Sequence, residues 1–216
     1  IPDTVTSIRR EAFERAHALT QVTFGSNSQL RTIEQEAFSY AKSLSAIAIP
    51  DTVTSIGREA FEYTDSLTQV TFGSNSELTT IGWGAFHRAI SLTAIAIPET
   101  VTSIDQNAFE RTAALTQVTF GANSRLSTIG PFAFSRASSL TRIAIPSTVT
   151  SIGSWAFDNA SALTSITFLG SAPVLDGSGQ FNALPSGAKA LVSRAHIGAG
   201  AGKFGNVGSS WNGLVV

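Results

Sequence analysis

The chain has 216 residues, of which 43% are hydrophobic and 13% charged, and its formal net charge is −1. This length suits one large domain or two small ones with a buried core, and the composition excludes a disordered chain of high net charge and low hydrophobicity. With this net charge the chain has no global electrostatic field that would attract nucleic acid or an anionic membrane. No apolar run approaches the ~18 residues that span a bilayer. Cysteine is absent, which excludes disulfides, thiolate metal sites and a thiol nucleophile.

An internal repeat dominates the sequence. The dipeptide Ala-Phe occurs seven times at alternating spacings of 25 and 23 residues, so the full unit is a 48-residue pair. The phenylalanines of these copies are Phe13, Phe38, Phe61, Phe86, Phe109, Phe134 and Phe157. Every copy has Ile five residues before its Phe and Leu six residues after it. A constant period of this length indicates a solenoid, in which each repeat forms one layer.

Each unit is expected to contain one helical turn and then one strand. Segment 11–16 places its two alanines and its Phe on one face of about one helical turn. Segment 19–24 alternates, with Val22 and Phe24 facing inward, and is typical of a strand. One strand and one turn cannot close a core alone, but stacked copies can do so by aligning their strands. The predicted fold is therefore an α/β solenoid, a rod with one parallel β-sheet.

The period divides the chain into two parts. Residues 1–168 form the array of seven 23/25-residue repeats, and the period breaks in residues 169–216. Phe181 follows Phe157 by 24 residues, and segment 190–192 supplies one more strand. Since a solenoid must cover its last hydrophobic layer, we interpret 169–216 as a degenerate eighth repeat and C-terminal cap.

The repeat resembles the BspA-like (treponemal-type) class of bacterial leucine-rich repeats. The resemblance rests on Leu-Thr-x-Val/Ile-x-Phe/Ile followed by Thr-Val-Thr-Ser-Ile-Gly-x-x-Ala-Phe, and it covers residues 1–168. That class often has Cys three residues after the Ala-Phe dipeptide, where this chain has only Ala or Thr. Small residues fill the same position, so the fold expectation is unchanged. The resemblance implies a leucine-rich repeat protein that is secreted or on the cell surface, acts in adhesion or recognition, and offers no catalytic residues to carry over.

No constellation of catalytic or metal-ligating residues emerges. The histidines His17, His87 and His196 occupy different columns of the repeat or lie outside it, and none has HxxxH or His–carboxylate spacing. Serine and threonine are plentiful, but no His and acid stand at matching repeat positions to activate one of them. We therefore expect no catalytic residues, no cofactor and no metal site, and the chain is not predicted to be an enzyme.

Exposed columns of the repeat supply the candidate partner-binding residues. The strand face displays small or weakly polar side chains; the candidates on it are Gln69, Thr71, Gln117, Thr119 and Arg142. Such residues also suit tight parallel strands without any partner. Phe132 and Trp155 share a column that is otherwise mostly polar, and Trp83 is one column away. An aromatic pair on a polar row is a candidate contact patch, and packing under the C-terminal cap is the alternative.

A further column, two residues after each Phe, combines Arg and Tyr, which are favoured in interfaces. In several copies a Glu lies four residues earlier, which favours pairing along a helix surface as the explanation. Charge is also uneven: residues 1–110 hold 7 Lys/Arg and 13 Asp/Glu, a balance of −6, whereas residues 111–216 hold 7 and 2, a balance of +5. This asymmetry is compatible with weak head-to-tail self-association, and drift between repeats without any function is the simpler account.

Three function classes remain. The leading hypothesis is a non-catalytic extracellular or cell-surface recognition scaffold that binds a protein or glycan on a host, matrix or neighbouring cell, with no nucleic acid and no membrane insertion. The first alternative is a structural spacer within a larger surface protein. The second is an ice-binding surface, suggested by regularly spaced Thr on a flat sheet. Against it, Thr alternates with Ala between repeats, and leucine-rich solenoids usually curve.

Overall fold

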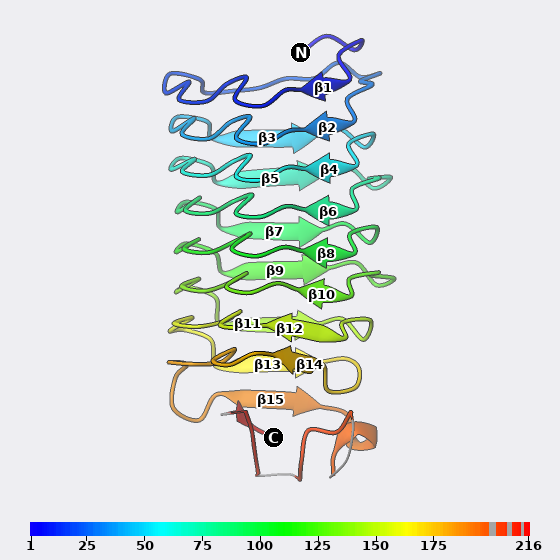
Figure 1. The fold of residues 1–216 in the computed structure, drawn as a ribbon, viewed down its shortest axis with the longest axis vertical. Helices are drawn as coiled ribbons and strands as arrows, with labels where there is room; N and C mark the ends of the chain where they lie inside the picture. Colours follow the sequence, from blue (N-terminus) through cyan, green and yellow to red (C-terminus); the bar gives the residue numbers. More distant parts are fainter. Residues whose placement is uncertain (199–201, 207–208, 213) are drawn as a thin grey trace.

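In the computed structural model, the chain is a parallel β-solenoid of about nine turns, stacked one above another along a single axis (Figure 1). The structure describes residues 1–198, 202–206, 209–212 and 214–216. The predicted solenoid is thus confirmed. The exact count of seven repeats plus one is not, because a further strand layer follows the eighth coil.

Each coil from the second to the eighth contributes two strands, not one. The first strand of each coil joins an eight-stranded parallel sheet in the order β1-β2-β4-β6-β8-β10-β12-β14. Its members are β1 (Ser7–Ile8), β2 (Thr32–Ile33), β4 (Ser55–Ile56), β6 (Thr80–Ile81), β8 (Ser103–Ile104), β10 (Thr128–Ile129), β12 (Ser151–Gly153) and β14 (Val174–Asp176). In the seven repeats the invariant Ile of each strand is buried, while the Ser or Thr before it is half-buried. The prediction of one sheet is therefore wrong. This second row of strands was not predicted because a two-residue Ser/Thr-Ile strand is too short to show an alternating pattern.

From the second coil on, the second strand of each coil forms the opposite face, at the repeat position where the sequence predicted a strand. Segment 19–24 of the first coil is not a strand, because it has a neighbour on one side only and pairs through a single isolated bridge from Gln21 to Ala46. A four-stranded sheet has the order β3-β5-β7-β9, and a five-stranded sheet has the order β11-β13-β15-β17-β16. The bounds are β3 (Ala46–Ile49), β5 (Gln69–Phe72), β7 (Ala94–Ile97), β9 (Gln117–Phe120), β11 (Arg142–Ile145), β13 (Ser165–Phe168), β15 (Lys189–Val192), β16 (Ser210–Trp211) and β17 (Leu214–Val215). Neighbouring strands pair at equivalent repeat positions, for example Ala46 with Gln69.

The expected helical turn is wrong. Segment 11–16 and its equivalents form tight turns in which the residues two before and two after each Phe are left-handed, as at Glu11 (φ 58°) and Arg15 (φ 55°). The Phe13 amide donates to the Ala37 carbonyl of the next coil at 2.8 Å, whereas an α-helix would direct every amide back along its own segment. This stack of turns, linked from coil to coil, is called the turn face below. In the described residues the only helix is the 3₁₀ turn η1 (Arg194–His196), and no helix is long and apolar enough to cross a membrane.

A ladder of phenylalanines runs through the core. The Phe of each repeat stacks on the next with ring centroids 5.1 to 5.5 Å apart, and the ladder ends on Phe181 at 5.9 Å. From Phe38 to Phe157 these rings are completely buried. The column where the family often has Cys is buried as well from the second coil on, and Thr64 within it donates its hydroxyl to the Phe61 carbonyl at 2.7 Å. Small residues therefore do fill that position, as the sequence predicted.

The last coils close with a cluster of aromatic residues. Phe204 lies with its ring centroid 4.7 Å from that of Phe168, and Trp211 packs edge-on against both rings. Strands β17 and β16 extend the second face beyond β15, and β16 pairs with β17 in antiparallel fashion. Residues 169–216 thus add layers over the seventh repeat.

Candidate interaction surfaces

The pair Phe132 and Trp155 lies on the turn face, in the left-handed column before the buried Phe. The rings stack at 5.2 Å between centroids with an interplanar angle of 26°. Trp155 is 38% exposed and Phe132 is half-buried. The C-terminal aromatic cluster is built from Phe168, Phe181, Phe204 and Trp211, so the pair is no part of it. Trp155 nevertheless lies against Gly179 of the C-terminal segment 169–216, so the alternative of packing at the cap holds for one side of its indole.

Trp83 does not join this pair. It stacks with Arg58 of the preceding coil, whose guanidinium carbon lies 4.3 Å from the ring centroid. Arg58 also lies 3.1 Å from the Glu59 carboxylate. Burial raises the pKa of Glu59 above its ordinary value, and the charge of nearby Glu62 adds to that effect. Arg58 was not predicted from the sequence, although Arg58 and Trp83 both stand three residues before a repeat Phe and so occupy one column.

A four-member stack occupies the column two residues after each Phe. Tyr40 and Tyr63 stack at 4.5 Å, Arg15 caps Tyr40 at 5.7 Å, and Arg88 caps Tyr63 at 5.0 Å. Burial is the main cause that raises the pKa of Tyr40. The expected helix-surface pairing is wrong because there is no helix; Arg15 instead pairs with its neighbour Glu14 at 3.2 Å. This column stabilises the turn face through cation–π contacts.

The histidines make local contacts. His87 is the most enclosed: its Nδ1 lies 2.8 Å from Glu62 and its Nε2 lies 3.8 Å from Glu110, so it bridges two neighbouring coils. His17 contacts the Tyr40 carbonyl at 3.0 Å, and His196 contacts the Ser193 hydroxyl at 2.7 Å. The three histidines lie apart from one another on different coils.

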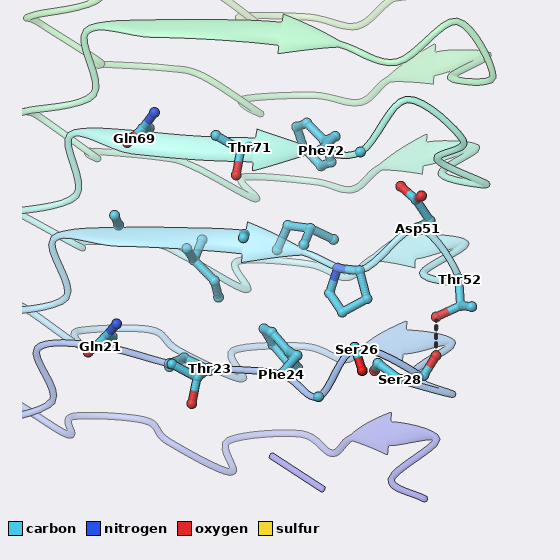
Figure 2. A pocket seen from close by; sticks show the side chains of 18 of the residues that line it. Gln21, Thr23, Phe24, Ser26, Ser28, Asp51, Thr52, Gln69, Thr71 and Phe72 are labelled. Atoms are coloured by element: carbon cyan, nitrogen blue, oxygen red, sulfur yellow. Dashed lines mark hydrogen bonds between the residues drawn. The ribbon is translucent and has the colours of Figure 1, made fainter. Parts of the chain in front are cut away.

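The strand face is ridged. Strands with the sequence Gln-Val-Thr-Phe alternate with strands of Ala-Ile-Ala-Ile, so Gln and Thr side chains stand on either side of a floor of alanines. Figure 2 shows the first of these grooves, with Gln21, Thr23 and Phe24 on one side and Gln69, Thr71 and Phe72 on the other. The outward Gln, Thr and Ala side chains are all exposed.

The grooves repeat with the 48-residue period. The groove over β3 has a volume of about 910 Å³ and ends at the turn of Asp51 and Thr52, where the Thr52 hydroxyl donates to the Ser28 carbonyl at 3.2 Å. An equivalent groove over β7 lies between Gln69 and Gln117 and measures about 470 Å³. On β11 the first alanine is replaced by Arg142, which is exposed. The structure thus brings the predicted strand-face candidates together on one surface.

The stacked coils and their buried Leu, Ile and Phe columns define a leucine-rich repeat solenoid. The sequence matches the family model of the BspA type leucine rich repeat region in six copies, over residues 1–116 and 74–178. The chain therefore belongs to the BspA-type leucine-rich repeat family. Proteins of this family are repeat scaffolds, generally without enzymatic activity. Among curated proteins, no sequence gives a significant match.

The chain is similar to solved structures of bacterial leucine-rich repeat proteins, and the first of them shares its fold. A leucine-rich repeat protein from Bacteroides ovatus is 26% identical with a TM-score of 0.66, over 91% of this chain and 55% of that protein. The Treponema pallidum leucine-rich repeat protein is 22% identical with a TM-score of 0.49, over 77% and 76%. A leucine-rich cell surface protein from Faecalibacterium prausnitzii is 23% identical with a TM-score of 0.37, over 83% and 69%. This chain thus spans about half the length of the Bacteroides protein.

Proposed function

We propose that the chain is a non-catalytic recognition scaffold, extracellular or on the cell surface, that binds a protein or glycan partner of a host, a matrix or a neighbouring cell. Invariant residues are committed to the core, so a specific contact must use side chains that differ between coils. The turn face and the strand face both offer such side chains.

The observation that carries this proposal is the exposed stack of Phe132 on Trp155. Both residues are left-handed, with φ 56° and 52°, a conformation that costs a bulky side chain about 1–2 kcal/mol. Two other coils place Gly84 or Asn107 in the same column, which accept this conformation more readily, and the remaining three place Glu11, Glu36 and Glu59 there. Stability of the turn alone therefore requires no aromatic side chain at this position. Large, rigid aromatics are the side chains that contribute most binding energy in interfaces.

A binding screen with matched aromatic variants tests the proposal. The chain is immobilised and exposed to extracellular matrix proteins and to a panel of glycans. For any partner found, the double variant Phe132→Ser/Trp155→Ser should weaken binding by at least ~2 kcal/mol. The control is Tyr40→Ser/Tyr63→Ser, which removes the other stacked aromatic pair of the turn face and should leave binding intact. Circular dichroism must show that both variants stay folded.

Two results would contradict this assignment. Retained affinity in the aromatic variant together with loss in Gln69→Glu/Gln117→Glu would move the site to the strand face. A scaffold that binds none of the partners, but whose length sets the reach of a neighbouring domain in the intact protein, would be the structural spacer.

A further inference from the structure

Two cations stand in one column of the five-stranded sheet on the strand face. Arg142 of β11 pairs with Ser165 of β13, and Ser165 pairs with Lys189 of β15. Both cations are exposed, while Ser165 between them is half-buried. Neither cation forms an ion pair within the part of the chain that the structure describes. The column therefore presents a low hydroxyl between two long, solvated cations.

No side-chain carboxylate opposes these cations on their own face. Strands β9, β11, β13 and β15 contain none, and residues 111–216 hold only Asp158 and Asp176. Asp158 accepts hydrogen bonds from the amides of Asn159 and Asn182 on the turn face. Asp176 belongs to β14 in the opposite sheet, where it accepts from the Ser151 hydroxyl. The positive potential of the five-stranded sheet is therefore not cancelled locally.

We propose that this column binds an acidic polysaccharide that runs along the rod axis, across the strands. Acid groups on alternate sugars pair with Arg142 and Lys189, and the sugar between them lies over Ser165. A guanidinium pairs with a carboxylate or sulfate through two parallel hydrogen bonds, and the serine hydroxyl bonds to a hydroxyl of the sugar. The site lies on a different face from Phe132 and Trp155, so it does not depend on the partner contact proposed there.

The spacing of the cations selects among anionic chains. Arg142 and Lys189 are two strands apart, or about 9.6 Å. An extended acidic peptide presents its same-side carboxylates every second residue, about 6.8 Å apart, and the phosphates of a nucleic acid strand recur about every 3.4 Å along its axis. One sugar of a linear polysaccharide is about as long as the strand spacing of about 4.8 Å. Acids on every second sugar therefore match the two cations best.

The neighbouring outward column offers a surface for the sugar ring. It consists of Ala144, Thr167 and Leu191, which pair directly across β11, β13 and β15. Leu191 is 45% exposed, which gives the apolar C–H face of a sugar something to cover. The cations thus hold the acid groups, while this second column contacts the ring.

Isothermal titration calorimetry of the intact chain with a hyaluronan octasaccharide, which carries a carboxylate on every second sugar, tests the site. We expect binding that weakens as salt is raised, and no binding of the methyl-esterified octasaccharide. The variant Arg142→Ala/Lys189→Gln installs residues that other coils carry in this column. It should weaken binding at least about tenfold, because two charge pairs are lost.

A matched control removes the same charge elsewhere. Arg111→Asn/Arg136→Asn takes two cations from the turn face, in the column where Asn159 already stands with a left-handed backbone. It should change the affinity for the octasaccharide less than about twofold, since distant charges are screened. Phe132→Ser/Trp155→Ser should also leave this affinity unchanged, so failure of the turn-face contact and failure of this site are separate results. Equal melting temperatures would show that the variants fold.

A charge-preserving variant tests the spacing. Arg142→Ala/Ser165→Arg keeps the net charge but brings the two cations onto adjacent strands, and it should weaken binding at least about threefold. Unchanged affinity in this variant would overturn the choice of a polysaccharide. The proposal is also overturned if the octasaccharide does not bind, if the turn-face control loses binding equally, or if an oligoglutamate or a single-stranded oligonucleotide of equal charge binds as tightly.

Discussion

Gly179 lies against the indole of Trp155, one coil further along the column that also holds Phe132. A Cβ on Gly179 would overlap the Nε1 and Cδ1 atoms of Trp155. The indole is therefore bounded by the Phe132 ring on one side and by a bare glycine backbone on the other. This contact explains how a tryptophan on the turn face stays stacked while 38% of its surface remains exposed.

Gly179→Ala should destabilise the chain more than Gly187→Ala. Both glycines are left-handed, with φ 70° and 78°, so each substitution should cost about 1–2 kcal/mol of backbone strain. Only Gly179 faces Trp155, whereas a Cβ on Gly187 has no atom within 4 Å. Overpacking should therefore add about 1–3 kcal/mol at Gly179, measured by urea denaturation. Equal costs at both positions would show that the indole moves aside freely.

Phe61→Ala should cost about 3–5 kcal/mol, because it leaves a cavity between the stacked rings of Phe38 and Phe86 in the buried ladder. Phe132→Ala removes one exposed stacking contact and should cost about 1 kcal/mol. Chemical denaturation of the two variants side by side gives the comparison. If both changes proved equally destabilising, Phe132 would belong to the core and not to the surface.

The sequence was sufficient to predict the solenoid because inward positions repeat without exception. Val70 and Ile47 fall on the buried side of their strands, as the alternation around Val22 and Phe24 predicted. The turn conformation was not predictable in the same way. Left-handed residues are normally signalled by Gly or Asn, and the columns concerned mostly hold Glu, Arg, Tyr, Phe or Trp. Gly84 and Asn107 gave the only such hint in their column, since hydrogen bonds between coils enforce the conformation on the rest.

The candidate surfaces were predictable as columns but not as contacts. Column spacing placed Phe132 beside Trp155 and correctly predicted their neighbourhood. Column spacing alone did not reveal that Arg58 covers Trp83. The two residues share the column three before each Phe, but a shared column does not show that a charged side chain folds over an aromatic ring. The grooves depend on the height difference between Gln or Thr and Ala. That difference was visible in the sequence, but whether it forms a groove depends on how neighbouring strands are aligned, and the structure pairs Ala46 and Ala48 directly with Gln69 and Thr71.

Glu59→Gln should stabilise the chain at neutral pH but not in acid. Burial raises the pKa of Glu59 above its ordinary value of 4.5, so folding disfavours the charged form. The contribution of Glu59 to the free energy of unfolding is then most favourable below pH 4.5, where Glu59 is protonated in both the folded and the unfolded state. This contribution declines as pH rises through the pKa of the folded state. The neutral amide escapes this loss. Melting temperatures of wild type and variant should therefore diverge between pH 4 and pH 7, with the variant higher at pH 7.

Glu11→Gln is the matched control for Glu59. It occupies the same column with a similar left-handed backbone (φ 58° and 53°), but its side chain is 43% exposed, against 13% for Glu59. Its melting temperature should follow that of the wild type at both pH values. A Glu59→Gln variant that showed no divergence either would mean that Arg58 compensates fully for the burial of the carboxylate.

Removing residues 169–216 should cause the rod to aggregate. The deletion takes away β15, which pairs along the whole of β13, and with it the contacts of Phe204 and Trp211 on Phe168. An unpaired parallel edge above an exposed apolar layer is a template for association with further chains. Light scattering should report large or polydisperse species for the truncated rod, whereas the intact chain should give a narrow size distribution. The single change Trp211→Ala should reproduce part of the effect, with a loss of about 3 kcal/mol, because Trp211 packs against three other aromatic rings. A truncated rod that remained monodisperse and melted at the temperature of the intact chain would show that these residues are not the cap.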